Sequence, residues 1–229
     1  MSGETIRIAG ASGFWGDAAR STPQLLKDED VDFIVYDYLA EITMSIMARA
    51  RAKNPDNGYA LDFVSAVMKP NLTEIARQSV RIISNAGGVN PRACADALRG
   101  VIAELNLDLK VACVLGDDMI GQRDEIAAQG HKEMFSGDEF PDVSKVASIN
   151  AYLGAFPVAR ALQEGADIVI TGRSVDSAVT LGACIDAFGW GRGDLNQLAM
   201  GSLAGHILEC GPQATGGNFT DWELSNNLE

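Results

Sequence analysis

The feature that most constrains the fold is a repeated unit in which a short apolar strand ends in a polar corner and a helix follows. Its clearest copy runs from Val80 to Asn90, with the sequence VRIISNAGGVN, and continues into Pro91. The β-branched run stops at Ser84, and Asn90 and Pro91 are typical of a helix cap and a first helical position. Ligands of open α/β sheets bind outside the carboxyl ends of the strands, so we expect such corners to face a site.

Four further strands are predicted, at residues 6–9, 31–38, 109–115 and 166–170. Their alternation with helical segments predicts an α/β fold with a mostly parallel sheet and helices on both faces, doubly wound and Rossmann-like. A partial (β/α) barrel is the alternative, because strand order cannot be read from the sequence. No linker divides the chain, so we expect a single α/β domain over residues 1–229.

Helical segments are predicted between these strands. They cover about residues 22–27, a helix from 39 onward, 59–78 with a bend or break near Pro70, 91–106, 148–164 and 194–210. Ser148 is expected to cap the helix that it begins, and Gly165 to end it.

Composition excludes several classes of partner. The 229 residues carry a formal net charge of −13, which is the wrong sign for binding nucleic acid. No apolar run approaches the length of a membrane span, and the N-terminus lacks the pattern of a signal peptide. The four cysteines are widely spaced, as in reduced proteins. We therefore expect a cytoplasmic protein that binds a small-molecule substrate and neither nucleic acid nor membrane.

Four residues are candidates for acid/base catalysis. Asp117 and Asp118 end the strand at 109–115, where two adjacent carboxylates favour hydroxyl binding or a divalent metal. A helix N-cap is the alternative for this pair. His206 and Glu209 lie three residues apart on one predicted helix face, and are either a catalytic pair or a polar surface.

A glycine-rich loop follows the first strand. Its spacing, G-x-x-G-x-x-G, differs from the dinucleotide fingerprint and gives little support to NAD binding. Gly10, Ser12 and Gly13 are candidate substrate-binding residues in this loop. A glycine turn that permits close packing is an equal alternative.

The corner after the strand at 166–170 has the residues of an anion site. Arg173 can bind a carboxylate or phosphate through two parallel hydrogen bonds, and Gly172 permits close approach of the backbone. Ser174 and Asp176 are expected to cap the next helix or to contact the ligand. The alternative is that Arg173 pairs with a local acid such as Asp176.

An ordered set of motifs resembles the acyclic terpene utilisation (AtuA-like) family. The motifs are IRIAGASGFWGD, ISNAGGVNP, VLGDD, NAYLGA, VITGRSVD and LAGHILECGPQATGG. They cover nearly the whole chain, which resembles the N-terminal portion of the family's large domain. The resemblance implies bacterial catabolism of branched terpenoid acids as coenzyme A thioesters.

This resemblance implies an enzyme that acts on an acyl-CoA thioester, of lyase or hydratase type. In that interpretation Asn85, with the amides of Gly87 and Gly88, polarises a carbonyl group. The other interpretations are a non-catalytic acyl-CoA-binding or scaffold subunit and, with less support, a hydrolase. We also expect a homo-oligomer, or a complex in which another chain completes the domain.

Overall fold

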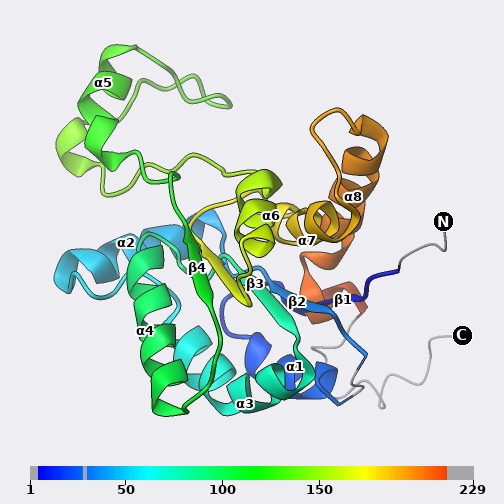
Figure 1. The fold of residues 1–229 in the computed structure, drawn as a ribbon. Helices are drawn as coiled ribbons and strands as arrows, with labels where there is room; N and C mark the ends of the chain where they lie inside the picture. Colours follow the sequence, from blue (N-terminus) through cyan, green and yellow to red (C-terminus); the bar gives the residue numbers. More distant parts are fainter. Residues whose placement is uncertain (1–4, 28–29, 216–229) are drawn as a thin grey trace, which may run out of the picture.

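The computed structural model describes residues 5–27 and 30–215 and contains a five-stranded parallel sheet in the order β1-β2-β3-β5-β4 (Figure 1). The strands are β1 Ile8–Ser12, β2 Phe33–Tyr36, β3 Arg81–Ser84, β4 Val111–Val114 and β5 Ile168–Thr171. All five predicted strands are confirmed, and the fold is the predicted Rossmann-like α/β arrangement.

Helices cover both faces of the sheet (Figure 1). One face packs against α1 Ala18–Leu25, α2 Glu41–Lys53, a π-helical turn η1 Phe63–Met68, α3 Lys69–Gln78 and α4 Pro91–Glu104. The other packs against α6 Ala155–Gln163 and α7 Ala178–Phe188, with α8 Leu195–Leu208 beyond α7. Short turns complete the described elements: η2 Ile120–Gln122, α5 Arg123–Ala128, η3 Val143–Lys145 and η4 Gly211–Thr215.

The position of β5 between β3 and β4 decides between the two predicted architectures. A (β/α) barrel places its strands side by side in chain order. Here the chain turns back after β4, and β5 lies between β3 and β4. Right-handed crossovers explain the two helical layers, because the step from β4 back to β5 reverses direction and places α6 on the opposite face. The sheet is therefore open and doubly wound.

The buried residues of β3 show how both faces are packed. Ile82 belongs to the apolar cluster that includes Leu98 of α4, whereas Ile83 belongs to the cluster that includes Val158 of α6 and Val179 of α7. Successive side chains of a strand point to opposite faces. A strand covered on both sides must then be apolar throughout, which is why these strands read as continuous hydrophobic runs.

Of the bend or break predicted near Pro70, the break is wrong. The chain stays helical from η1 into α3, and Pro70 occupies the second position of α3. The π-helical turn widens the backbone just before the proline. A wider turn accommodates a residue that has no N–H to donate, so the helix continues.

The helix expected to begin at Ser148 begins instead at Ala155. Residues 149–153 are extended because they bond to two other segments: the Met119 amide donates to Ile149 O and the Leu153 amide to Arg173 O. Residues 116–150 thus form a lobe that leaves the sheet after β4 and returns before α6 (Figure 1). Within the described ranges, no helix has the length and apolar character needed to cross a bilayer.

Gly87 provides a test of the close approach between the ends of β3 and β5. A Cβ atom there would overlap Thr171 O and would lie 2.6 Å from Pro91 Cβ. We expect Gly87→Ala to lower the free energy of unfolding by about 1–3 kcal/mol, because two backbone segments must separate. Urea denaturation measures this change.

The matched control is Gly100→Ala in the middle of α4, where an added Cβ meets nothing within 4 Å. We expect that substitution to raise stability by about 0.5–1 kcal/mol through helix propensity. Equal stabilities of the two variants would contradict the close approach at Gly87.

Candidate active site

Polar residues from four strands meet at the carboxyl edge of the sheet. Asp37 follows β2 and Asn85 follows β3; the Asn85 side chain donates to Asp37 Oδ1 at 2.5 Å and accepts from the Tyr38 amide at 2.7 Å. Beyond β5, the Arg173 amide donates to Asp117 Oδ2 at 2.8 Å, and Asp117 follows β4. The strand order thus brings Asn85, Arg173 and Asp117 to one edge.

This edge includes the point where the fold reverses direction. β3 leads into α4 on one face, whereas the neighbouring β5 leads into α7 on the other. Open α/β sheets bind ligands at such a switch point. We therefore take the residues around the ends of β3 and β5 as the candidate active site.

Arg173 is the central cation of this site, and it is only 4% exposed. Its Nη1 donates to Leu39 O at 3.0 Å and to Asp176 Oδ1 at 3.1 Å. Its guanidinium lies 4.1 Å from the centre of the Tyr152 ring, and the Tyr152 hydroxyl donates to Glu41 Oε1 at 2.6 Å. The pairing of Arg173 with a local acid is therefore present, and a substrate anion would compete with it.

Three carboxylates lie close together at this edge, and one of them, Asp176, pairs with Arg173. Ligand atoms of Asp37, Asp176 and Glu209 are all within 4.8 Å of one another. Burial raises the pKa of Asp37 to about 7, and the charges of Asp176 and Glu209 add to this effect. Hydrogen bonds from Asn85 and Leu39 act in the opposite direction. Asp37 can therefore accept and release a proton near neutral pH, as a general acid or base must.

The two adjacent carboxylates after β4 have separate partners. Asp117 is buried and accepts from Asn150 Nδ2 at 2.9 Å as well as from Arg173, and burial raises its pKa. Asp118 pairs with Arg51 at 3.3 Å and accepts from the Ile120 amide at 3.0 Å. These contacts give Asp118 a role in holding the lobe to α2.

A metal at Asp117 and Asp118 stays a prediction. Within residues 5–27 and 30–215, the group of three carboxylates with the spacing of a metal site is Asp37, Asp176 and Glu209. Carboxylate oxygens suit a hard cation such as Mg²⁺ or Ca²⁺. Arg173 already neutralises part of that charge, so this group fits proton transfer at least as well as metal binding.

A catalytic pairing of His206 with Glu209 stays a prediction. His206 is exposed on α8, and no hydrogen bond joins it to Glu209 in the part of the chain that the structure describes. Glu209 instead lies at the end of α8 with Asp37 and Asp176. Of this predicted pair, only Glu209 reaches the candidate active site.

The first strand is longer at its end than predicted, so Gly10 and Ser12 lie within β1 and not in a loop after it, whereas Gly13 directly follows β1. This segment packs against the end of α8. A Cβ on Gly10 would lie 2.6 Å from Leu208 O, and one on Gly13 would overlap Cys210. This contact matches the packing alternative for the loop. It also holds Glu209, which lies between Leu208 and Cys210, near the sheet edge.

Ser12, at the end of β1, has a buried hydroxyl that donates to Asp37 O at 3.0 Å. It therefore fixes the backbone that carries Asp37. Asn85 acts on the same residue through its side chain. Both predicted binding residues thus position Asp37.

Gly87 and Gly88 shape the loop after β3. Gly88 has a φ of 54°, which favours glycine, and its amide donates to Asn85 O at 3.2 Å. An added Cβ on Gly88 would also overlap the Met47 side chain. Polarisation of a substrate carbonyl by these amides stays a prediction.

The corner after β5 does not cap α7 as predicted. Ser177 is the N-cap residue, without a side-chain hydrogen bond. The Asp176 side chain turns to Arg173 instead, and Ser174 is buried with no hydrogen-bond partner for its hydroxyl among the described residues. Gly172 makes room for the Asp117 carboxylate, which an added Cβ would overlap.

Two residues of the site were missed by the sequence analysis. Asp37 directly follows a buried strand, as Asn85 does, so the same strand-end argument would have found it. Tyr152 carries no such signal, because only the return of the lobe places it over Arg173.

Comparison with protein families gives one match, "Acyclic terpene utilisation family protein AtuA", over residues 6–229. The chain belongs to this family. The resemblance inferred from the motifs is thereby confirmed, and the AtuA family links the chain to acyclic terpene utilisation. Comparison with curated proteins gives no match.

One solved structure matches, a dihydropteroate synthase from Xanthomonas albilineans with 4-aminobenzoic acid. It is 12% identical, and the match covers 100% of this chain and 96% of that chain with a TM-score of 0.24. A similarity at that level supports no conclusion about the AtuA chain.

The raised pKa of Asp37 predicts a pH-dependent stability. The folded state holds this proton up to about pH 7, whereas an unfolded aspartate loses it near 3.8. Stability therefore falls as pH rises from about 4 to about 7, and stays lower above that range. We expect Asp37→Asn to be more stable than the wild type at pH 8 by about 2–4 kcal/mol.

Below pH 4 the difference between Asp37→Asn and the wild type should nearly disappear, because both side chains are then neutral. Urea denaturation of both proteins at several pH values measures it. A difference that is the same at every pH would contradict the raised pKa.

Proposed function

We propose that this AtuA-family chain acts on a coenzyme A thioester of a branched or terpenoid acid, in a lyase- or hydratase-type reaction. The observation that carries the proposal is the Asp37 carboxyl, buried at the carboxyl edge of the sheet with a pKa of about 7. Lyases and hydratases of thioesters need a proton to move at the carbon next to the carbonyl. Asp37 has the protonation behaviour for that step.

In the proposed step the Asp37 carboxylate takes a proton from the carbon next to the thioester carbonyl. The electron pair of the broken C–H bond passes to the carbonyl oxygen and forms an enolate. Loss of a hydroxyl group from the next carbon, protonated as it leaves, gives water and an unsaturated thioester. Glu209 and Asp117 are the candidates for that second proton, because both lie at this edge of the sheet and burial raises the pKa of Asp117.

Arg173 is proposed to bind a carboxylate of the substrate and also to neutralise part of the negative charge of the neighbouring acids. Its Nη2 lies 3.7 Å from Glu41, a longer contact than those of Nη1. Removal of the cation would leave Asp37 and Asp176 without their counter-charge and would destabilise the fold. Arg173→Lys keeps the charge but loses the paired donors.

We expect Arg173→Lys to raise the KM for a carboxylated thioester at least tenfold, with a smaller effect on the same thioester without the carboxylate. Steady-state kinetics with the two substrates measure this split. An equal effect on both substrates would show that Arg173 positions the acids and does not bind the substrate.

Hydrogen exchange at the substrate carbon tests the role of Asp37 directly. In D₂O the wild type should exchange the proton next to the carbonyl of a branched acyl-CoA, with a rate that rises through about pH 7. Asp37→Asn should exchange this proton at least a hundredfold more slowly than the wild type, because general acid–base catalysis typically contributes at least that factor. Mass spectrometry of the recovered thioester measures the exchange.

The matched control is Asp96→Asn, an exposed aspartate on α4 whose partner is Arg99. It should exchange at the wild-type rate. Exchange by Asp37→Asn at the wild-type rate would reject Asp37 as the base.

A second candidate function is a subunit that works only in a complex. The face of α8 favours it: Met200, Leu203 and Ile207 are each more than half exposed, and α8 contains no Asp, Glu, Lys or Arg. Exposed apolar faces of this kind mark contact surfaces. Turnover by the purified chain alone would reject this second candidate.

A further inference from the structure

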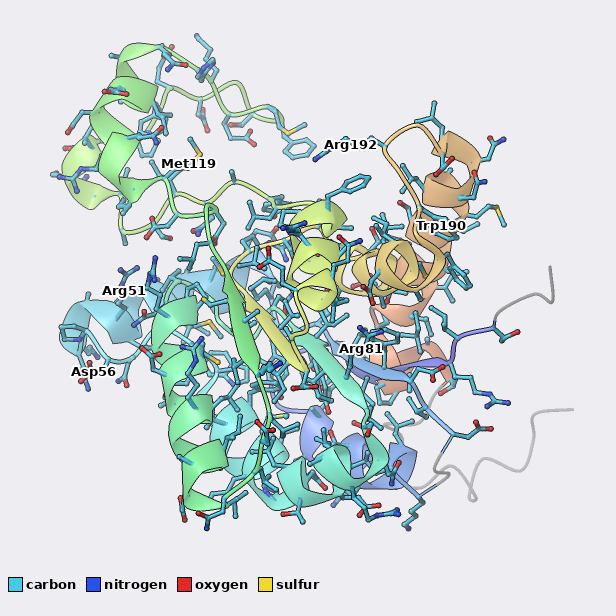
Figure 2. The ribbon with its side chains drawn as sticks, viewed as in Figure 1. Arg51, Asp56, Arg81, Met119, Trp190 and Arg192 are labelled. Carbon is cyan, nitrogen blue, oxygen red and sulfur yellow. The ribbon has the colours of Figure 1, made fainter. Side chains whose placement is uncertain are left out.

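A cleft lies between the carboxyl-terminal end of α2 and the lobe of residues 116–150. It consists of two cavities of about 360 and 220 Å³ that share Arg51, Val89 and Asp118 in their walls. Figure 2 shows Arg51 at the end of α2, below the lobe that carries Met119. None of the acids grouped with Asp37 lines this cleft. Asp117, which belongs to the same edge of the sheet, does line it.

The larger cavity is mainly apolar. Its apolar lining residues are Ala48, Ala52, Pro55, Val89, Ile120 and Ala147. At one end it reaches Asn150, which donates to Asp117 and lies two residues before the tyrosine that stacks on Arg173. An uncharged chain in this cavity would therefore lead toward the candidate active site.

The smaller cavity carries two arginines, Arg51 and Arg92. Arg92 is exposed in the first turn of the 14-residue helix α4, and no ion pair of it is found among residues 5–27 and 30–215. Arg51 bonds to Val89 O at 2.6 Å, and its contact with Asp118 is longer, at 3.3 Å. An anion between the two arginines could replace Asp118 as the partner of Arg51.

The smaller cavity also contains the carboxylates of Asp117 and Asp118. Asp117 already accepts from the Arg173 amide and Asn150. Asp118 accepts from the Ile120 amide, so Arg92 is the cation that is left for an added anion.

The paired N–H groups of an arginine guanidinium match the spacing of phosphate oxygens. The free N–H groups at the start of α4 add a positive electrostatic potential. The backbone there is held in place, since the Asn90 side chain donates to Pro55 O at 2.8 Å and to Asn57 O at 2.9 Å.

We propose that this cleft binds the phosphate-bearing end of the coenzyme A thioester, with Arg51 and Arg92 on a phosphate and the uncharged arm along the apolar cavity. The inference rests on the proposed function and assigns a binding site to the coenzyme A portion of the substrate. It also assigns the lobe a role, because the lobe supplies one wall of the cleft.

Binding of free coenzyme A tests the assignment without any need for turnover. Isothermal titration of the wild type, Arg51→Ala and Arg92→Ala should show affinity at least tenfold weaker in each variant. Arg99→Ala is the matched control, since Arg99 lies on the same helix and pairs with Asp96 outside the cleft. It should bind coenzyme A as the wild type does.

Pantetheine, which has the uncharged arm but no phosphate, separates a phosphate contact from a loss of structure. It should bind all four proteins with the same affinity. Binding of coenzyme A at wild-type strength by both Arg51→Ala and Arg92→Ala would overturn the cleft assignment and leave the proposed function intact. Failure of the wild type to bind either coenzyme A or its thioesters would overturn both.

Discussion

The insertion of β5 between β3 and β4 is the constraint on which the site depends. It places the Arg173 corner between Asn85 and Asp117, residues that lie 88 and 56 positions away along the chain. The reversal of direction also places α4 and α7 on opposite faces of the sheet, so the ends of β3 and β5 form the switch point of the fold. Glycines at positions 87 and 172 allow this approach, because an added Cβ at either would overlap a neighbouring strand end.

The electrostatics of the site follow from that crowding. The Arg173 guanidinium pairs with Asp176 and Glu41, and Asp176 in turn lies within 4.8 Å of ligand atoms of Asp37 and Glu209. Burial of Asp37 is the main reason that its pKa rises to about 7, and the nearby charges of Asp176 and Glu209 raise it further. This arrangement costs stability at neutral pH, and such costs are characteristic of functional sites. Asp37 therefore lowers stability at a position where an apolar or amide side chain would not, as expected for a residue that is kept for function.

The central strands were predictable from the sequence because they are buried on both faces and end in polar corners, as β3 does at Ser84 and Asn85. The edge strands β1 and β4 are only partly buried, but they too are short apolar runs that end in polar corners. The meeting of the strand ends at one edge followed from parallel strands alone. The strand order could not be predicted. The local sequence of β5 is equally compatible with a place between β3 and β4 and with a place at the edge beyond β4. The positions of Tyr152 and Glu209 likewise depend on long-range contacts. Tyr152 lies in the segment that follows the lobe and bonds to the Arg173 corner, and Glu209 lies between two residues that pack against Gly10 and Gly13.

The lobe connects the candidate active site to the proposed cofactor cleft. Its first residues carry Asp117 and Asp118, which bond to Arg173 and to Arg51 respectively. Its last residues carry Asn150, which bonds to Asp117 and lines the larger cavity. A ligand that displaces Asp118 from Arg51 would break a side-chain contact between the lobe and α2. The buried bond from the Arg173 amide to Asp117 does not involve α2, so the lobe would stay attached to the sheet edge.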